Sequence, residues 1–429
     1  MQDKTLAEWL DYIGRQHSAE IVMGLERVRE VWARMGKPQA PRNIIVGGTN
    51  GKGSTCAMLE SIYAIAGYKT GFYTSPHLLR YNERVRLNRA DASDAKLCAA
   101  FAAVEAARIT PTLIPFTYFE YATLSALWLF AEEKVEVALL EVGMGGRLDA
   151  VNLVDADVSI VTSVDLDHQG YLGNTREQIA WEKAHIYRTN RPAIFADHMA
   201  PETLKTYAET LGAELIVLNR DYRFSRMDNQ WQFLMTHAGS LHARHALPLP
   251  ALRGDYQLKN ASAALAAITC LGELLPVSLN HIKRGLLEVE WPGRLQVLPG
   301  RPTVVLDVAH NPHAARALAD AMGSMGYFEN TYAVFAMLKD KDMAGVIDAL
   351  KGRVDRWFIA GLPTERGASA EQIAALLRAQ KCDDRIVLCS TVTTAYQAAR
   401  EMAKHNDRIL VFGSFYTVAD VLATSRSAT

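Results

Sequence analysis

Short apolar runs recur along the first 200 residues of the chain, and stretches with helical spacing lie between them. The apolar runs cover residues 43–48, 70–75, 135–143, 157–163 and 192–197, and the helical patterns cover 52–66, 118–132 and 175–187. Within each run the apolar residues are consecutive and do not alternate with polar ones, so both faces of the strands should be buried. The pattern therefore predicts an α/β domain with a mostly parallel, doubly wound sheet covered by helices.

The pattern changes after residue 213. Residues 214–250 mix short strand-like stretches with turns, which predicts a small β subregion on the first domain. Helical patterns return at 257–273 and 278–289, and Pro and Gly then concentrate in 290–302, as in a linker. We therefore expect a first domain over residues 1–293 and a second over residues 294–429.

A second series of strands and helices follows the linker. Strand-like runs occur at 303–309, 332–337, 356–361, 385–389 and 408–413, and each precedes a segment that is compatible with a helix. This predicts a Rossmann-like α/β domain. No GxGxxG motif follows its first strand, so a dinucleotide is not expected there.

Composition and charge narrow the function classes. The 429 residues carry a net charge of −1, which provides no global field to attract nucleic acid or an anionic membrane. The five cysteines are scattered and include no CxxC pair, which is typical of a reducing compartment. Neither a signal peptide nor an apolar run of the ~18 residues needed to span a membrane is evident. We expect a cytoplasmic protein.

The stretch "IIVGGTNGKGST" (44–55) joins a strand to a helix through a glycine-rich turn. Its four glycines let the backbone N–H groups approach an anion, and the helix N-terminus adds partial positive charge. Lys52 would supply a point charge for the β- and γ-phosphates, and Ser54 or Thr55 a hydroxyl for phosphate or Mg²⁺. Gly53 separates Lys52 from Ser54, unlike the standard P-loop pattern. The stretch predicts a nucleotide phosphate loop.

Polar residues end several of the predicted strands. Glu141 ends the run at 135–143 as a Walker-B carboxylate does, and Asp165, Asp167 and His168 follow the run at 157–163. Open α/β sheets bind ligands at the carboxyl ends of their strands, so Glu141 and this loop should converge. Lys183 lies in a helical segment beside acidic and aromatic residues, and from the residues alone a surface helix with salt bridges is favoured.

In the second domain, Asp307, His310 and Asn311 follow an apolar strand and precede Pro312, which suits the first turn of a helix. This clustering indicates a second set of functional side chains that faces the linker.

Taken together, these motifs resemble the Mur ligase superfamily and, within it, the bacterial bifunctional dihydrofolate synthase / folylpolyglutamate synthase family. The matching segments run in order along nearly the whole chain: "GLERV" (24–28), "GGTNGKGST" (47–55), "YTSPHLLRYNERVRL" (73–87), "TYFEYATLSALWLF" (117–130), "LLEVGMGGRLDAVN" (139–152), "DLDHQGYLG" (165–173), "EKAHIYR" (182–188), "WPGRLQ" (291–296) and "DVAHNPHAA" (307–315). The extra glycine is explained because this family writes its phosphate loop TNGKG[ST].

The resemblance implies an ATP-dependent ligase that joins L-glutamate to dihydropteroate and to reduced folates through an acyl phosphate. It implies that ATP is the co-substrate and that Mg²⁺ occupies two sites. It further implies that Lys183 is carbamylated, so that the carbamate serves as a metal-binding carboxylate. No nucleic acid or membrane partner is expected, and we expect a monomer.

The resemblance also assigns residues to the site. Those implied in ATP binding are Thr49, Asn50, Gly51, Lys52, Gly53, Ser54, Asn260, Arg294 and Asp307. Those implied in metal binding are Ser75, Glu141, His168 and the carbamylated Lys183, and those in catalysis are Lys52, Glu141, His168, Lys183 and His310. The implied pterin pocket comprises Thr117, Tyr118, Phe119, Glu120, Leu148, Asp149 and Ala150. Because ATP residues lie on both sides of the linker, we expect catalysis to require domain closure.

The chain departs from the family pattern at five positions. Val22 stands where an acid is frequent, Trp181 and His185 replace residues that are commonly glycine, Tyr256 replaces a histidine and Gln169 a threonine. None of these departures removes a metal ligand or a phosphate contact.

Three alternatives remain open at this point. A peptidoglycan Mur ligase would normally carry a further N-terminal domain, for which the roughly forty residues before the phosphate loop leave no room. A folylpolyglutamate synthase without dihydropteroate activity is the second alternative. A nucleotide-dependent switch is the third, although Lys52, Glu141, His168 and Lys183 together exceed what a switch requires.

Overall fold

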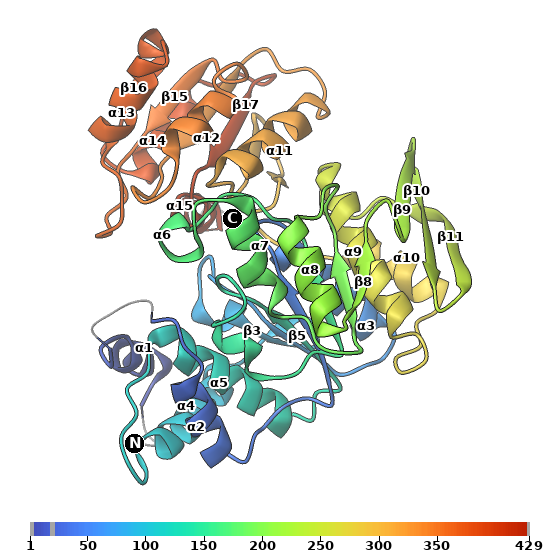
Figure 1. The fold of residues 1–429 in the computed structure, drawn as a ribbon. Coiled ribbons are helices and arrows are strands. Elements are labelled where there is room, and N and C mark those ends of the chain that lie inside the picture. Colours follow the sequence, from blue (N-terminus) through green and yellow to red (C-terminus); the bar gives the residue numbers. More distant parts are fainter. Residues whose placement is uncertain (1–3, 18–21, 427–429) are drawn as a thin grey trace. The chain divides into compact units, whose positions relative to one another are not determined.

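The computed structural model describes residues 4–17 and 22–426, which form two compact units (Figure 1). Unit 1 comprises residues 1–251 and 258–289, and unit 2 comprises residues 252–257 and 290–429. The chain therefore passes into unit 2 for six residues before it returns to unit 1. The last boundary between the two units therefore lies between residues 289 and 290, and residues 252–257 belong to unit 2.

Unit 1 is built on an eight-stranded sheet of order β4-β3-β2-β5-β1-β6-β7-β8. Six of its strands are parallel: β1 (Arg42–Gly47), β2 (Thr70–Tyr73), β5 (Val137–Glu141), β6 (Val158–Val161), β7 (Pro192–Phe195) and β8 (Glu214–Val217). The two short strands β3 (Val85–Leu87) and β4 (Ala90–Asp91) continue one edge antiparallel. The central strands are buried along their whole length, as their consecutive apolar residues predict.

The structure corrects the expectation for residues 214–250. Residues 214–217 form β8, which pairs parallel with β7 and extends the main sheet. The separate β subregion is therefore the three-stranded antiparallel sheet of β9 (Tyr222–Met227), β10 (Gln230–His237) and β11 (Ser240–Pro248). Within β8, Glu214 is exposed, whereas Ile216 and Val217 are buried.

The helices of unit 1 include α3 (Lys52–Ile65), which is buried from Gly53 to Tyr63 and so lies in the core. The others are α1 (Leu6–Gly14), α2 (Glu26–Arg34), α4 (Asp94–Ile109), α5 (Tyr118–Glu132), α6 (Gln169–Leu172), α7 (Arg176–Ala184), α8 (Glu202–Leu211), α9 (Tyr256–Cys270) and α10 (Leu279–Glu288), with 3₁₀ turns at Tyr81–Arg84 and Ala150–Leu153.

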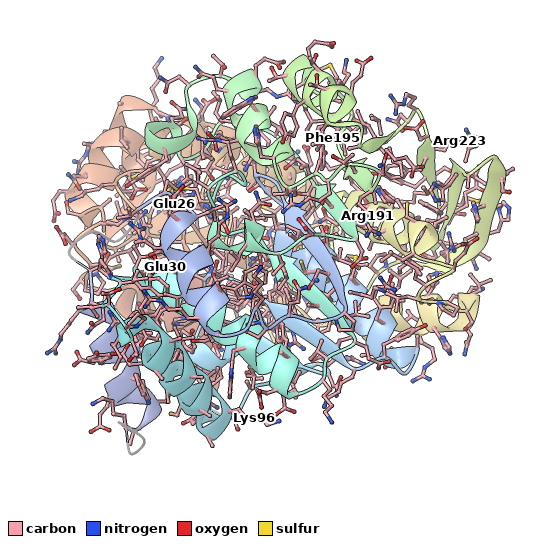
Figure 2. All side chains as sticks on the ribbon, turned by 60° about the horizontal axis from the view of Figure 1, so that its bottom comes forward. Glu26, Glu30, Lys96, Arg191, Phe195 and Arg223 are labelled. Carbon is pink, nitrogen blue, oxygen red and sulfur yellow. The ribbon has the colours of Figure 1, made fainter. Side chains whose placement is uncertain are left out.

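Helix α2 illustrates how the polar pattern orients these helices. Val28 and Val31 are buried, whereas Glu26 and Glu30, one turn apart, lie on its exposed side (Figure 2). This spacing of apolar residues defines a narrow stripe that packs inward.

Unit 2 contains a six-stranded sheet of order β12-β13-β17-β14-β15-β16. Its parallel strands are β13 (Thr303–Leu306), β14 (Thr331–Phe335), β15 (Arg356–Ile359), β16 (Ile386–Leu388) and β17 (Arg408–Phe412). The helices are α11 (Pro312–Gly323), α12 (Met343–Leu350), α13 (Ala370–Ala379), α14 (Val392–Met402) and α15 (Phe415–Arg426), with a 3₁₀ turn at Asp383–Arg385. Part of the expected linker, β12 (Gln296–Leu298), is instead an antiparallel edge strand.

Among residues 4–17 and 22–426, no helix combines the length and the hydropathy that a membrane crossing requires.

Candidate active site

The glycine-rich loop between β1 and α3 has a backbone that requires glycine. Gly48 has φ +138°, and a Cβ there would lie 1.9 Å from Thr162 Oγ1. Gly51 has φ +91° at the N-cap of α3, and a Cβ there would lie 2.4 Å from Asn260 Oδ1. The loop therefore fits closely against the strand β6 loop on one side and against α9 on the other. The predicted strand, loop and helix are all present.

The loop is fixed by hydrogen bonds to the segment after β6. The Thr49 N–H donates to Ser163 O at 2.8 Å, and the Asn50 N–H donates to Ser163 Oγ at 3.1 Å. Lys52 Nζ donates to the loop carbonyls of Gly48 and Thr49, at 3.1 and 3.3 Å. The first N–H groups of a helix have no acceptor within it, so the start of α3 at Lys52, Gly53 and Ser54 is suited to bind an anion.

Glu141 ends β5 directly beside the strand that leads into this loop. It pairs in register with Val46 of β1, and it is only 5% exposed. Thr74 Oγ1 donates a short hydrogen bond to Glu141 Oε2. Thr74 follows β2, the neighbour of β5, and precedes Ser75, so the predicted ligand Ser75 follows the same strand end. The sequence analysis missed Thr74, although a hydroxyl beside Ser75 at a strand end could have indicated it.

His168 lies in the loop after β6, which also contacts the phosphate loop. The Asp165 N–H donates to Thr49 Oγ1 at 3.0 Å, and Thr49 Oγ1 donates in turn to Asp165 O at 3.1 Å. His168 adopts the left-handed conformation, with φ +49°, and its Nε2 lies 4.0 Å from Asp167 Oδ1. The strand β5, which ends at Glu141, and the strand β6, which precedes this loop, are separated only by β1 and run parallel to it, so both strand ends lie at the same edge of the sheet.

Lys183, near the end of α7, is buried and not on a salt-bridged surface. It is 4% exposed, and burial lowers the pKa of its amine to about 7, with a further contribution from the positive charge of Lys52. The carboxylates of Asp167 and Asp149 act in the opposite direction. At neutral pH a substantial fraction of the amine is therefore unprotonated, and only that form can react as a nucleophile. The interpretation from the residues alone, an exposed helix, is wrong at this position.

The side chains at this edge of the sheet fit a divalent metal. Glu141 supplies a buried carboxylate, Ser75 a hydroxyl, and a carbamate on Lys183 would add further oxygen ligands of the kind that Mg²⁺ prefers. Within the described ranges no group of three or more His, Cys, Asp or Glu side chains is placed to hold a metal ion. The expected set contains only two such residues, Glu141 and His168, and its other donors are of different types.

The residues implied in the pterin pocket lie at the start of α5 and in the loop after β5. A Cβ at Gly143 would lie 2.6 Å from Phe119 Cζ and 3.3 Å from Asp149 Oδ2, so Phe119 and Asp149 flank the same backbone position. The Asp149 carboxylate accepts from the N–H groups of Met144 and Val151, at 2.8 and 2.9 Å. Burial raises the pKa of Asp149 to about 6 despite these hydrogen bonds. Leu148 and Ala150 flank Asp149 in the chain.

Glu120 has a different environment from Asp149. Its Oε2 accepts from the N–H and Oγ1 of Thr117, at 2.8 and 2.9 Å, which closes a capping box at the N-terminus of α5. Its Oε1 accepts from Arg27 of α2, with the shorter contact at 2.8 Å. Oε2 therefore caps α5, and Oε1 links α5 to α2. Tyr118, the first residue of α5, lies against the Arg84 guanidinium at 5.3 Å.

In unit 2, the predicted residues gather after β13. Asp307 is buried, and its carboxylate accepts from the N–H groups of Leu295 and Ala309, each at 2.8 Å. The Arg294 guanidinium and the His310 ring both lie against Phe415, at 5.2 and 6.3 Å. Burial raises the pKa of Asp307, and the charge of Arg294 opposes this.

Tyr256 also hydrogen bonds to Asp307, and it belongs to the short segment that groups with unit 2. The sequence analysis recorded this residue only as a departure from the family pattern. Asn260, one turn further along α9, lies against Gly51 in unit 1.

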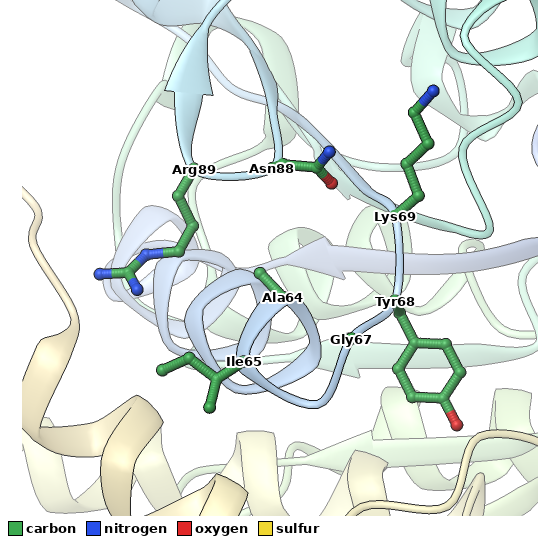
Figure 3. Close-up of a pocket in the computed structure, with 7 residues that line it drawn as sticks. All are labelled: Ala64, Ile65, Gly67, Tyr68, Lys69, Asn88 and Arg89. Carbon is green, nitrogen blue, oxygen red and sulfur yellow. The ribbon is translucent and has the colours of Figure 1, made fainter.

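A separate open hollow of about 450 Å³ lies at the carboxyl end of α3 (Figure 3). It is lined by the end of that helix and by the β3–β4 turn, through Ala64, Ile65, Gly67, Tyr68, Lys69, Asn88 and Arg89. The phosphate loop lies at the opposite end of α3, and Arg89 is already paired with Glu288 at 3.2 Å. This hollow is therefore not part of the candidate active site.

Comparison with known proteins supports the resemblance. The Mur ligase middle domain model matches residues 46–268, and the model of the Mur ligase glutamate ligase domain matches residues 293–415. A protein of Escherichia coli K12 named dihydrofolate synthase/folylpolyglutamate synthase is 46% identical over 97% of this chain and 94% of its own length. A Haemophilus influenzae protein of the same name is 38% identical over 97% of each chain.

Solved structures agree along the whole chain. E. coli FolC in complex with DHPP and ADP is 44% identical and superposes with a TM-score of 0.93, over 100% of this chain and 99% of that one. A bifunctional folylpolyglutamate synthase/dihydrofolate synthase with Mn, AMPPNP and L-glutamate bound is 42% identical, with a TM-score of 0.90 over 99% of each chain. The chain belongs to the Mur ligase superfamily and, within it, to the dihydrofolate synthase/folylpolyglutamate synthase family.

Proposed function

We propose that this protein is an ATP-dependent ligase that joins L-glutamate to dihydropteroate, giving dihydrofolate, and to reduced folates, giving folylpolyglutamates. The observation that carries the proposal is the grouping of the phosphate loop, Glu141 and the buried Lys183 in unit 1. This arrangement occurs in a chain that is 46% identical, over almost its full length, to a dihydrofolate synthase/folylpolyglutamate synthase.

The reaction requires two successive transfers. A carboxylate oxygen of the pterin substrate attacks the γ-phosphorus of ATP, ADP leaves, and an acyl phosphate forms. The amine of glutamate then attacks the acyl carbon, loses a proton, and expels phosphate to leave an amide. Both steps depend mainly on positioning and on neutralisation of negative charge.

The residues of the phosphate loop bind and orient ATP. The backbone N–H groups at the start of α3 and the ammonium of Lys52 lie where the β- and γ-phosphates would be held. A divalent metal, held by Ser75, Glu141, His168 and the Lys183 carbamate, would neutralise charge on the phosphates. The low pKa of Lys183 supports the carbamate, because the unprotonated amine adds CO₂ and then releases a proton.

The pterin substrate would lie between the start of α5 and the loop after β5. Phe119 provides an aromatic face, and Asp149 a buried carboxylate that can accept hydrogen bonds from the pterin amino groups. Glu120 would shape the wall of this pocket without contacting the pterin, because Thr117 and Arg27 already occupy its carboxylate. In unit 2, we assign Arg294 and Asp307 to ATP binding and His310 to catalysis.

The test is ADP release by the purified protein with MgATP and L-glutamate. One reaction contains dihydropteroate, a second contains tetrahydrofolate and a third contains neither, and mass spectrometry identifies the products. We expect release in both substrate reactions, with each product heavier by one glutamyl unit, and none from a Lys52→Met variant. Release with tetrahydrofolate alone would instead establish a folylpolyglutamate synthase without the dihydropteroate reaction. No release in any reaction would refute the proposal.

The monomeric state and the cytoplasmic location are separate proposals. The five cysteines, which are scattered and all free, support the cytoplasmic location. Sedimentation equilibrium with and without MgATP tests the first, and fractionation of cells tests the second.

A further inference from the structure

The loop that follows β5 is fastened to the end of α7. A Cβ at Gly146 would lie 2.7 Å from Glu182 O and 3.1 Å from Lys183 O, so only glycine lets the loop approach the helix this closely. The next N–H, that of Arg147, donates to Glu182 O at 2.9 Å. The Arg147 guanidinium then donates to Glu182 Oε1 through Nη2 at 3.0 Å and through Nε at 3.2 Å.

The carboxylate of Glu182 depends on this arginine. The Glu182 side chain is 12% exposed, and its Oε2 is buried without a hydrogen-bond partner among the described residues. A shielded carboxylate that loses its cation is strongly unfavourable, so the side chain should move if Arg147 is removed. Glu182 directly precedes Lys183, so a shift of the α7 backbone at Glu182 would displace the amine.

Aromatic rings extend this contact away from the loop. The Arg147 guanidinium lies 4.7 Å from the centre of the Trp181 ring, and the Trp181 and His185 rings are 4.3 Å apart. His185 in turn stacks on Tyr207 of α8, with ring centres 4.1 Å apart and planes at 29°.

We propose that Arg147 and Glu182, supported by the Trp181–His185–Tyr207 stack, act as positioning residues that hold Lys183 in place relative to the substrate loop at 143–150. We refer to these five residues as the loop–helix clamp. The loop begins just after Glu141 and ends at Asp149 and Ala150, whereas α7 carries Lys183. The clamp therefore links the side of the site that binds the pterin to the lysine implied in metal binding. The inference rests on the proposed function.

The proposal predicts which kinetic step is affected. A displacement of about 1 Å at a catalytic group can cost roughly 100-fold in rate. Loosening the clamp should therefore lower kcat, and it should raise the KM for dihydropteroate, whose predicted pocket includes the loop. The phosphate loop is held by separate hydrogen bonds to the segment after β6, so the affinity for ATP measured without a divalent metal should change little.

The experiment compares Arg147→Met with the matched control Arg89→Met. Arg89 pairs with Glu288 at 3.2 Å and its side chain is 30% exposed, against 3.0 Å and 35% for Arg147. We measure kcat, the KM for each substrate, ATP binding by calorimetry in the presence of EDTA, and the ¹³C signal of the Lys183 carbamate after incubation with ¹³C-bicarbonate. For Arg147→Met we expect kcat to fall roughly 10- to 100-fold, a weaker carbamate signal and unchanged binding of metal-free ATP. Arg89→Met should retain the parent values.

Two further results test the loop–helix clamp. Equal kinetics and equal carbamate signals in Arg147→Met and Arg89→Met would overturn the clamp. If Arg147→Met does not fold, Arg147→Lys keeps the charge but cannot reproduce the forked contact, and it should show the same pattern to a smaller degree. Failure of the proposed function is distinguishable, because the parent protein would then be inactive, whereas a failed clamp leaves an active parent and an unaffected Arg147→Met.

Discussion

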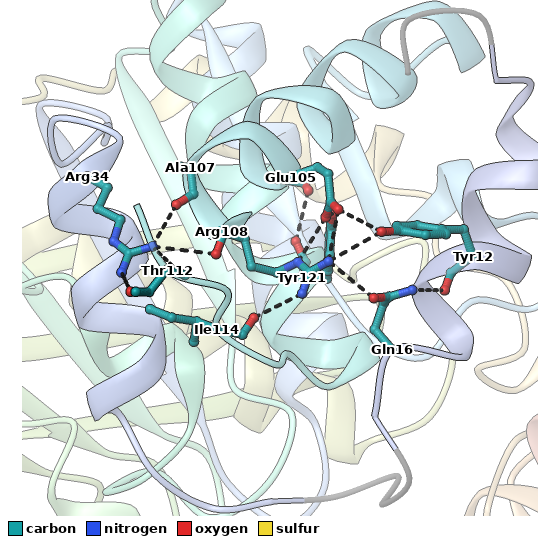
Figure 4. Close-up of polar contacts among 10 residues, drawn as sticks. Tyr12, Gln16, Arg34, Glu105, Ala107, Arg108, Thr112, Ile114 and Tyr121 are labelled. Carbon is teal, nitrogen blue, oxygen red and sulfur yellow. Dashed lines mark hydrogen bonds and ion pairs between the residues drawn. The ribbon is translucent and has the colours of Figure 1, made fainter. Parts of the chain in front are cut away.

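A buried polar network joins α1, α4 and α5 on the side of unit 1 that carries the predicted pterin residues (Figure 4). The Glu105 carboxylate accepts from Tyr12 Oη at 2.6 Å, from Arg108 Nε at 2.8 Å and from Tyr121 through a short hydrogen bond. The Arg108 guanidinium also donates to Ile114 O at 3.0 Å and to Gln16 Oε1 at 3.1 Å. The side chains of Glu105 and Arg108 are each 2% exposed.

Replacing Glu105 by Gln should destabilise unit 1 considerably. The substitution keeps the shape but leaves the buried Arg108 charge without its carboxylate, and removal of one partner of a buried pair costs about 3–5 kcal/mol. At roughly 2.1 cal/mol/K of unfolding entropy per residue, about 280 residues give ~0.6 kcal/mol/K, so Tm should fall by about 5–8 °C. Turnover measured well below Tm should be retained.

Differential scanning calorimetry of the parent and of three variants checks this magnitude. Glu202→Gln breaks an exposed pair with Lys205, so it should lower the stability by less than about 1 kcal/mol. The double variant Glu105→Leu/Arg108→Met removes both charges and should recover part of the loss. A Glu105→Gln transition within 1–2 °C of that of Glu202→Gln would refute the reasoning.

The pH dependence gives an independent check on the same pair. Burial raises the pKa of Glu105, but hydrogen bonds from Arg108, Tyr12 and Tyr121 outweigh it, and the pKa is lowered overall. A carboxyl with a lowered folded pKa stabilises the protein above its ordinary pKa, and that contribution disappears as the pH falls through the folded value. The difference in stability between the parent and Glu105→Gln should therefore be constant near neutral pH and shrink in acid.

Three further substitutions test the site. Lys183→Met should abolish ADP release. Burial lowers the pKa of Lys183 to about 7, so above that pH the unfolded chain still binds a proton that the folded protein has lost. The Tm of the parent should therefore rise between pH 7 and 9, whereas the Tm of the variant should not, and calorimetry measures both. Gly48→Ala, whose Cβ would lie 1.9 Å from a side-chain oxygen, should weaken MgATP binding in titration calorimetry, whereas Gly67→Ala, at φ +97° with open space around it, should not. Tyr256→Phe removes a hydrogen bond to Asp307 and should raise the KM for MgATP by roughly 3- to 10-fold in the ADP-release assay, without changing that for dihydropteroate.

The apolar pattern predicted the central strands of both sheets because parallel strands buried on both faces have consecutive apolar residues. The same reasoning failed at the edges. The strands β3, β4 and β12 have only three, two and three residues, too few for any periodicity to show. The strand β8 has only four residues and begins with the polar Glu214, so the pattern does not separate it from the antiparallel strands that follow.

The chemistry of the phosphate loop could be predicted because its glycines and Lys52 are adjacent in the chain. Thr74, Thr162 and Tyr256 could not be found in this way, since each contributes through tertiary contacts. Thr74 reaches Glu141 across neighbouring strands, and Thr162 fills the space that Gly48 leaves open. Tyr256 reaches Asp307 across 51 positions of sequence, which no local pattern records.

Lys183 shows that the position of a residue along a helix can bear on its burial even where the neighbouring residues suggest an exposed surface. The acidic neighbour Glu182 suggested a salt bridge, but consecutive residues on a helix point about 100° apart and do not face each other. The buried positions of α7 are Ile179, Ala180, Lys183 and Ala184, which follow the i, i+1, i+4, i+5 spacing of an apolar stripe. A lysine on that stripe must be buried, and its ammonium must then be neutralised, deprotonated or modified. The structure therefore places Lys183 on the buried stripe of α7, whereas from the sequence only the resemblance to the family indicated a role for it.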